Sequence, residues 1–369
     1  MTTRLGSLLA GAAMVIGVGA ATVGVAQAKD FIITATKPNN LFVVDMAERK
    51  VVSECQILGR GSPISMAPSP TSNVVFVSTN GWGEVSGVDT DTCEEVFHAD
   101  LSEGNIRARN IAAMTISRDG KELYVQQTRV ELLPDRYNIL PHRIAVYDTD
   151  AGLDATPKRT FEVPRGISIM TPSVDGKYLW AGGHDAYQIE IATGKIVNTV
   201  PILNWERDRP TYGKPDALAF WPLYEQTEVM VLPYFAPKFA SEKQEEMVDF
   251  VVGTTRIDLT DNTWVQEDLT SADVLIFSMS LNPSNTDIIY GVYTQLSKYN
   301  VATKELEKRI DLDHTFYSVN VSSDGKEVYV GSTNDDIGVY DAETLEKLAI
   351  IKLPGGGDQG ALGFRMVQR

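Results

Sequence analysis

One short pattern recurs seven times along the chain: an apolar strand ends in an acidic residue or a close substitute, a polar turn follows, and a second apolar strand begins. Successive copies lie 44, 59, 42, 68, 42 and 41 residues apart. A period near 42 residues with short strands is typical of a β-propeller, in which each repeat forms one four-stranded sheet. We call the residues that end these strands the anchor residues: Asp45, Asp89, Asp148, Glu190, Asp258, Asn300 and Asp341.

A second pattern, Ser-x-Asp-Gly-Lys, stands upstream of several anchor residues, at Ser117–Lys121, Ser173–Lys177 and Ser322–Lys326. Looser versions are Pro68–Ser72 and Asn282–Asn285. The glycine of an Asp-Gly pair supplies the positive φ that a tight hairpin needs. The pattern therefore predicts the turn between the first and second strands of a blade.

The two ends of the chain complement each other. Phe31–Ala35 reads as the second strand of a blade whose first strand is missing, and Ala361–Val367 reads as a first strand without a blade. Pairing these segments removes two exposed sheet edges. The sequence thus predicts an all-β, seven-bladed propeller of four-stranded antiparallel blades, closed by its N- and C-terminal strands, as one domain over residues 29–369.

Two gaps between anchor residues are longer than the period requires. The second gap contains the segment Arg129–Tyr137, and the fourth contains Asn204–Glu206, Phe220–Tyr224 and Pro233–Pro237. Insertions on a repeat scaffold often mark the binding face. Their aromatic residues either pack the loops onto the blades or line a ligand or subunit interface.

The first residues resemble a secretory signal peptide. Arg4 precedes an uncharged apolar run from Leu8 to Val25, and Ala26-Gln27-Ala28 matches the small-x-small pattern of a cleavage site. The run is also just long enough to act as an uncleaved membrane anchor. Four glycines within it weaken a helix, so we expect residues 1–28 to be removed, a periplasmic location and no membrane insertion after cleavage.

Charge and motif content exclude several classes of function. The formal net charge is −16, which disfavours nucleic acid as a partner because an acidic surface repels phosphates. The four histidines lack a metal-ligand spacing, so no metal site is expected. Gly355–Gly360 matches Gly-x-Gly-x-x-Gly, but the residues after it read as a strand, whereas a dinucleotide site needs a helix there.

Cys55 and Cys93 are the only cysteines. Two cysteines cannot supply a Cys-x-x-Cys-His haem attachment, a four-thiolate cluster or a closed zinc site, so no cofactor is expected in this chain. The repeat places Cys55 near the end of an outer strand and Cys93 in the last turn of the next blade. A Cys55–Cys93 disulfide is possible in the periplasm, although the outer strands of adjacent blades diverge.

Several segments together resemble the β subunit of quinohemoprotein amine dehydrogenase, and the likeness spans residues 29–369. They are Lys29–Asp30, Asn204–Glu206, Pro215–Asp216, Pro233–Phe235, His314–Gly325 and Tyr340–Lys347. The resemblance implies a periplasmic heterotrimer that oxidises primary amines to aldehyde and ammonia. It also implies a small γ subunit with cysteine tryptophylquinone and an α subunit, a dihaem cytochrome c, while the propeller subunit has no cofactor and closes the substrate cavity.

The resemblance implies no catalytic residue in this chain, because the quinone belongs to the small subunit. Six side chains are candidates for the substrate cavity or a subunit interface: His314, Tyr317, Trp205, Trp221, Tyr234 and Phe235. For each of these residues the alternative is a purely structural role. Two other functions remain: the heavy subunit of a methylamine or aromatic amine dehydrogenase, and a non-catalytic periplasmic binding propeller.

Overall fold

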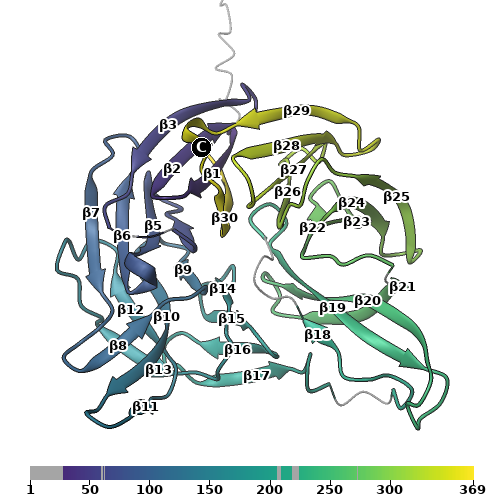
Figure 1. The fold of residues 1–369 in the computed structure, drawn as a ribbon, viewed down its shortest axis with the longest axis horizontal. Helices are drawn as coiled ribbons and strands as arrows, with labels where there is room; N and C mark the ends of the chain where they lie inside the picture. The colour runs from purple at the N-terminus through teal and green to yellow at the C-terminus, as the bar shows by residue number, and fades with distance from the viewer. Residues whose placement is uncertain (1–27, 60, 62, 206–208, 218–223, 272) are drawn as a thin grey trace, which may run out of the picture.

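The computed structural model describes residues 28–369 except 60, 62, 206–208, 218–223 and 272. The chain forms a ring of seven sheets around an axis, with almost no helix (Figure 1). The expected signal peptide lies outside the described residues, apart from Ala28. None of the helices in the described part is long and apolar enough to span a membrane.

Blades 1 to 3 contain the strands from the two ends of the chain and the first insertion. In every blade the four strands are given in their order from the axis outward. Blade 1 has β30 (Gln359–Gln368), β1 (Asp30–Thr36), β2 (Asn40–Asp45) and β3 (Lys50–Gln56). Blade 2 has β4 (Met66–Pro68), β5 (Val74–Thr79), β6 (Glu84–Asp89) and β7 (Glu95–Asp100), with the short 3₁₀ helix η1 (Asn80–Trp82). Blade 3 has β9 (Met114–Ile116), β10 (Glu122–Leu132), β12 (Arg143–Asp148) and β13 (Arg159–Glu162), extended by β8 (Ile106–Arg109) and β11 (Tyr137–Ile139).

Blades 4 to 7 follow in chain order. Blade 4 has β14 (Ile169–Pro172), β15 (Tyr178–Gly182), β16 (Ala186–Glu190) and β17 (Ile196–Val200), and blade 5 has β18 (Asp216–Ala217), β19 (Val229–Phe239), β20 (Met247–Asp258) and β21 (Trp264–Ser271). Blade 6 has β22 (Ser278–Asn282), β23 (Asn285–Val292), β24 (Gln295–Asn300) and β25 (Glu305–Asp311). Blade 7 has β26 (Ser318–Val321), β27 (Glu327–Gly331), β28 (Asp336–Asp341) and β29 (Lys347–Lys352), followed by η2 (Pro354–Gly356).

The sequence-based prediction of the fold is confirmed, including the closure. β30 pairs antiparallel with β1, with Phe31 opposite Val367 and Thr34 opposite Phe364. The last strand of the chain thereby becomes the innermost strand of the first blade (Figure 1). The glycine-rich stretch Gly355–Gly360 forms a short turn and the first two residues of this strand, rather than a nucleotide-binding loop.

Hydrophobic packing follows the ring. The described core residues fall into seven clusters, and each joins two neighbouring blades, from blades 1 and 2 round to blades 7 and 1. Inner strands such as β14 and β26 are buried throughout, whereas most residues of the outer strands β17 and β25 are exposed. Inner strands therefore read as continuous apolar runs, because both faces of each sheet contact another blade.

The two turn motifs have a common chemical basis. An anchor residue ends the third strand of every blade, and the residue four positions later always has a positive φ. In blade 7 the Oδ1 of Asp341 accepts hydrogen bonds from the backbone N–H groups of Glu343 and Thr344. In the Ser-x-Asp-Gly-Lys turn, Ser322 Oγ donates to Asp324 and accepts from the N–H of Lys326 and Glu327.

The antiparallel order gives the ring two distinct faces. Turns between first and second strands and between third and fourth strands lie on one side, which we call the turn face. Connections between blades and hairpins between second and third strands lie on the other side, the connector face. The long strands β10 and β19 enlarge the connector face, because they continue beyond the neighbouring blades at their C-terminal ends. These extensions stand on either side of blade 4. Tyr224 of the fourth gap lies instead between β18 and β19, on the turn face.

Candidate functional site: the connector face

An aromatic cluster lies on the connector face at blades 6 and 7. Phe277 and Tyr317 immediately precede the innermost strands β22 and β26, and Tyr293 is in the hairpin between β23 and β24. The ring centroids of Phe277 and Tyr293 are 4.0 Å apart and those of Phe277 and Tyr317 are 4.9 Å apart. All three side chains are half-buried. They form one partly exposed aromatic surface beside the axis, which we call the aromatic platform.

His314 holds the connector that leads to Tyr317. Its Nε2 lies 2.9 Å from Oδ1 of Asp336, and its Nδ1 lies 2.8 Å from the carbonyl oxygen of Thr315. Both ring nitrogens are thus within hydrogen-bond distance of a neighbouring oxygen. The other oxygen of Asp336 accepts from Lys352 at 3.0 Å. His314 is therefore fixed in a charged network rather than presented to solvent as an open ligand.

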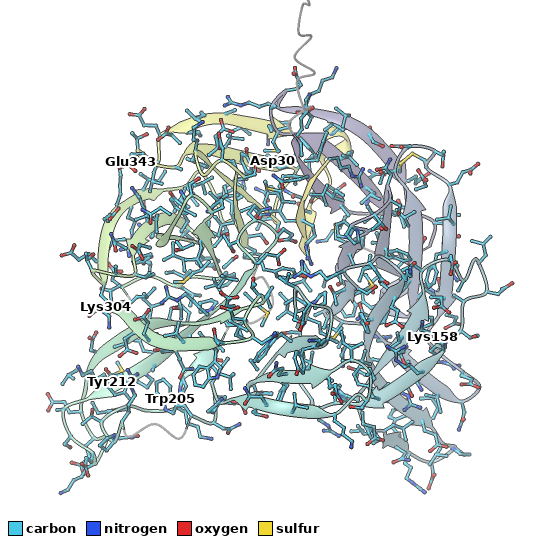
Figure 2. The ribbon with its side chains drawn as sticks, turned by 180° about the vertical axis from the view of Figure 1, so that it is seen from behind. Asp30, Lys158, Trp205, Tyr212, Lys304 and Glu343 are labelled. Carbon is cyan, nitrogen blue, oxygen red and sulfur yellow. A yellow bond between two sulfur atoms is a disulfide. The ribbon has the colours of Figure 1, made fainter. Side chains whose placement is uncertain are left out.

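The insertion in the fourth gap folds back onto blade 5 through a second cluster. Arg209 forms a bidentate ion pair with Asp268, with N–O distances of 2.8 and 2.7 Å. Trp205 packs edge-on against Tyr212 and Tyr234, with ring centroids 6.1 and 5.5 Å apart. Figure 2 shows Trp205 and Tyr212 close together at the periphery of the ring. This cluster fixes the course of the inserted connector.

Burial and hydrogen bonding act in opposite directions on the Asp268 carboxylate of this cluster. Burial alone raises the pKa of Asp268, but hydrogen bonds from Arg209 and Tyr234 outweigh it and hold that pKa below its usual value. Burial and the neighbouring Asp268 carboxylate raise the pKa of Tyr212. The Arg209–Asp268 ion pair and the neutral phenol of Tyr212 are thus stable together near neutral pH.

The candidate residues from the sequence do not form one site. His314 and Tyr317 belong to the connector that leads into β26 of blade 7, whereas Trp205 and Tyr234 belong to the Arg209–Asp268 cluster of blade 5. Tyr234 is fully buried, and Phe235 is buried and stacked on Phe250, so these two rings pack the blade. Trp221 lies outside the described residues.

Sequence reasoning missed Phe277 and Tyr293. Aligning the repeats would have found Phe277, because Phe277-Ser278 and Tyr317-Ser318 occupy the same position before a first strand. Tyr293 carries no such signal, since hairpins vary among the blades. The described residues contain no group of three or more histidine, cysteine or acidic side chains arranged to hold a metal ion.

The two cysteines form a disulfide between Cys55 in β3 and Cys93 in the turn after β6. It links blade 1 to blade 2 on the side of the ring where the chain ends also meet. The Cα atoms are 5.2 Å apart, within the range that a disulfide requires. The divergence of outer strands does not prevent the bond, because Cys93 lies in a turn that reaches back toward β3.

Comparisons with known proteins give the fold but no family. No protein-family model and no curated protein matches the chain. Hydrazine synthase from Kuenenia stuttgartiensis is similar in structure, with a TM-score of 0.55, 17% identity and coverage of 86% of this chain and 90% of that one. A functionally unknown protein from Desulfotomaculum acetoxidans has a TM-score of 0.57, 10% identity and coverage of 92% and 98%.

The dihydro-heme d1 dehydrogenase NirN is also similar, with a TM-score of 0.50, 14% identity and coverage of 91% of this chain and 75% of that one. At 10–17% identity these likenesses concern the fold alone. The chain is a seven-bladed β-propeller, and its activity has to be argued from its own surfaces.

Proposed function

We propose that this chain is the cofactor-free propeller subunit of a periplasmic quinohemoprotein amine dehydrogenase. In this proposal it is inactive alone and forms a wall of the substrate cavity beside a small subunit that carries the quinone. A dihaem cytochrome c subunit accepts the electrons, and the substrate is a primary amine.

The observation that carries the proposal is the aromatic platform. One of the segments that carry the resemblance, His314–Gly325, reaches the surface at Tyr317 and joins Phe277 and Tyr293 there. A partly exposed cluster of aromatic rings is typical of the centre of a protein interface. An aromatic wall also suits an amine substrate, because ring faces attract ammonium groups.

The fold is compatible with this role. Two of the similar structures are named as a synthase and a dehydrogenase, so the propeller occurs in named enzymes. The propeller would supply a rigid scaffold, and the connector face would present the inserted segments to the partners.

Affinity purification of the tagged chain from the periplasm of its producing cells tests the proposal. We expect a dihaem cytochrome and a small quinone-containing chain to co-purify, and the complex to reduce an artificial electron acceptor when a primary amine is added. A complex with one quinone subunit and no dihaem cytochrome would indicate the heavy-subunit alternative. A stable chain without partners would indicate a binding propeller and contradict the proposal.

Substitution at the platform tests the role of the surface. Tyr317→Ala should alter the KM for the amine in the assembled enzyme, and Phe277→Ala combined with Tyr317→Ala should weaken assembly. Trp264→Ala is the matched control, because Trp264 is an exposed aromatic residue on the outer strand β21. Normal assembly and unchanged kinetics of both platform variants would remove the platform from the proposed interface.

A further inference from the structure

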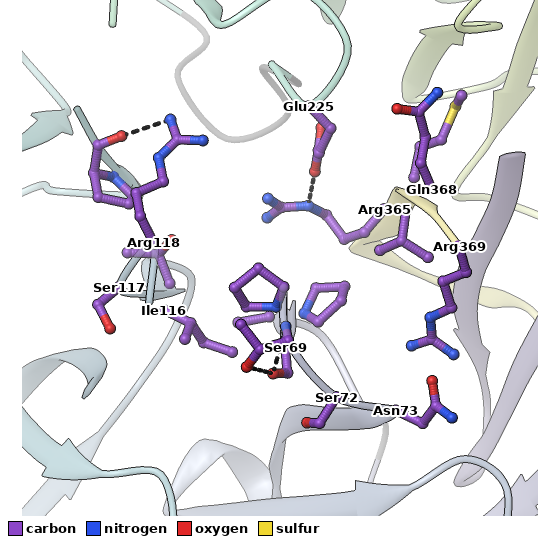
Figure 3. Close-up of a pocket in the computed structure, with 18 of the residues that line it drawn as sticks. Ser69, Ser72, Asn73, Ile116, Ser117, Arg118, Glu225, Arg365, Gln368 and Arg369 are labelled. Atoms are coloured by element: carbon purple, nitrogen blue, oxygen red, sulfur yellow. Dashed lines mark hydrogen bonds and ion pairs between the residues drawn. The ribbon is translucent and has the colours of Figure 1, made fainter. Parts of the chain in front are cut away.

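A separate cavity of about 510 Å³ lies on the turn face, away from the aromatic platform. Its walls come from the first strands and turns of blades 1 to 4 and from Tyr224 and Glu225, which precede β19 of blade 5. Figure 3 shows arginine side chains from different blades around this space. A volume of this size matches pockets that hold small organic molecules.

One wall of the cavity is largely apolar. Pro68, Pro70 and Ile116 line it, together with Val367 from β30. Hydroxyl groups stand among them, including those of Ser69, Ser72 and Ser117 (Figure 3). The cavity therefore offers an apolar surface to the body of a ligand and a few hydrogen-bonding groups to orient it.

The charge of the cavity is opposite to that of the chain. Three guanidinium groups line it, those of Arg118, Arg365 and Arg369, and Glu225 is the one acidic side chain among the described lining residues. The chain as a whole has a formal net charge of −16. A positive pocket in an acidic protein concentrates anions locally.

The guanidinium of Arg365 is fixed by contacts at Nε and Nη2. Its Nε pairs with Oε1 of Glu225, and its Nη2 donates to Oη of Tyr224 at 2.8 Å. Burial opposes the charge of Arg365, but Glu225 and Tyr224 outweigh burial and raise its pKa. Nη1 makes no hydrogen bond within the part of the chain that the structure describes, and the guanidinium faces the cavity (Figure 3). Its side chain is only 12% exposed, so water access to this free edge is restricted.

Arg118 and Arg369 complete the cationic lining. Both Nη atoms of Arg118 bind the carboxylate of Glu228, at 2.8 and 2.6 Å, while its buried Nε has no partner among the described residues. Arg369 stands at the rim, and its guanidinium has no direct ion pair or hydrogen bond among the described residues, although the carboxylates of Asp89 and Asp91 lie near enough to favour its charge. After these pairings, hydrogen-bond donors without a direct partner among the described residues remain at Arg365 and Arg369.

We propose that this cavity binds a small monocarboxylate with an apolar body. The carboxylate accepts hydrogen bonds from Nη1 of Arg365 and from the guanidinium of Arg369, and the apolar body lies against Pro68, Pro70 and Ile116. A guanidinium presents planar donors that match a carboxylate. The apolar wall disfavours a compact inorganic anion such as phosphate, which has no surface to place there. This site is independent of the proposed function, since it needs no partner subunit.

Calorimetric titration of the purified protein with phenylacetate tests the proposal, with phenylacetamide as the uncharged analogue and inorganic phosphate as the compact anion. We expect saturable binding of phenylacetate with one site per chain, and binding of phenylacetamide and phosphate at least ~10-fold weaker. Equal binding of phenylacetate and phenylacetamide, or no binding of phenylacetate, would overturn the proposal. Tighter binding of phosphate would show an anion site without an apolar subsite and would also overturn it.

A rim variant locates the site. Arg369→Gln should weaken phenylacetate binding by ~10-fold, because one charge-assisted contact is lost. Arg136→Gln is the matched control, since Arg136 is an exposed arginine in the insertion of blade 3, outside the cavity lining. The melting temperature of each variant without ligand verifies folding. Unchanged binding by folded Arg369→Gln protein would refute the placement.

Discussion

At the scale of single residues, the anchor residues explain why the repeat can be recognised in the amino-acid sequence. A short carboxylate at the end of the third strand reaches two backbone N–H groups of the turn, as Asp341, Asp89 and Asp258 all do. Asn300 does the same with its amide oxygen. A short side chain with an oxygen acceptor suits this turn best, which is why aspartate dominates and asparagine substitutes. Glu190 is the longer exception, and its carboxylate accepts a hydrogen bond from the hydroxyl of Thr193.

Replacing an anchor residue should destabilise the protein without affecting its partners. We expect Asp341→Ala to lower the free energy of unfolding by about 1–2 kcal/mol, because two backbone N–H groups lose a charged acceptor. Urea unfolding followed by fluorescence measures the change. Asp150→Ala is the control, since the exposed Asp150 side chain accepts no hydrogen bond within the described residues. Equal stability of the two variants would show that the anchor carboxylate is dispensable.

Glu122 makes stability depend on pH in the acidic range. Hydrogen bonds from Arg159, helped by Lys158 and Tyr124, lower the pKa of Glu122 to about 2. The usual pKa is 4.5, so the stabilisation is complete above pH 4.5 and is lost as the pH falls toward 2. The contribution is on the order of 2 kcal/mol, allowing for solvent screening.

Comparison of the parent protein with Glu122→Gln tests this dependence. The difference in free energy of unfolding should be largest above pH 5 and should shrink between pH 4.5 and pH 2. Chemical unfolding at a series of pH values measures it. Glu94→Gln serves as control, because Glu94 is exposed and has no ion pair in the described chain. A difference that stays constant with pH would contradict the assignment.

At the scale of strands, β30 decides whether the ring closes. Phe364 is 1% exposed and packs between blades 7 and 1, so closely that a Cβ on Gly331 would lie 2.4 Å from its ring. The side chain of Thr34 in β1 adds a hydrogen bond of 2.6 Å to the carbonyl oxygen of Gly363. One strand at the end of the chain therefore completes both a sheet and an interface between blades.

Removing this strand should destabilise the whole ring. Deletion of residues 364–369 leaves β1 with an open edge, and we expect a large fall in melting temperature. The milder change Phe364→Ala should cost about 3–5 kcal/mol through the cavity it leaves. Leu348→Ala is the control, because Leu348 is an exposed apolar residue of the outer strand β29. Melting curves identical to the parent for both β30 variants would refute the role of closure.

Regular elements could be predicted from the sequence, whereas the contacts of the insertions could not. The anchor residues and Asp-Gly turns determine the backbone locally, so the position of a turn such as Ser322–Lys326 follows from a few neighbouring residues. The pairing of Arg209 with Asp268, or of Arg365 with Glu225, joins residues far apart in sequence. No repeating pattern in the sequence indicates which residues form these ion pairs. The aromatic platform is intermediate, because the repeat predicts Phe277 from Tyr317 but gives no signal for Tyr293.

At the scale of the molecule, the disulfide and the closing strand secure the same part of the ring. Cys55 and Cys93 are 38 residues apart in sequence, and a cross-link over a loop of that length stabilises by about 3–4 kcal/mol when it restricts the unfolded chain. The bond joins blades 1 and 2, next to the interface where the first and last strands of the chain meet.

Removing the disulfide should therefore lower stability by about that amount. The double variant Cys55→Ala with Cys93→Ala, measured by chemical unfolding, should unfold at lower denaturant concentration than the parent protein. Reductant should shift the parent protein in the same direction and leave the variant unchanged. A variant as stable as the oxidised parent would show that the ring does not need this bond.

The residues around the turn-face cavity also connect blades that are not neighbours. Glu225 and Glu228, at the start of blade 5, pair with Arg365 of blade 1 and Arg118 of blade 3. In a linear repeat protein each unit contacts only the next, and unfolding can begin at an end and spread. The closed ring has no end blade, and these two ion pairs add contacts between blade 5 and blades 1 and 3. Unfolding of any one of these three blades breaks contacts of the other two. The molecule should therefore unfold as a single cooperative unit rather than blade by blade.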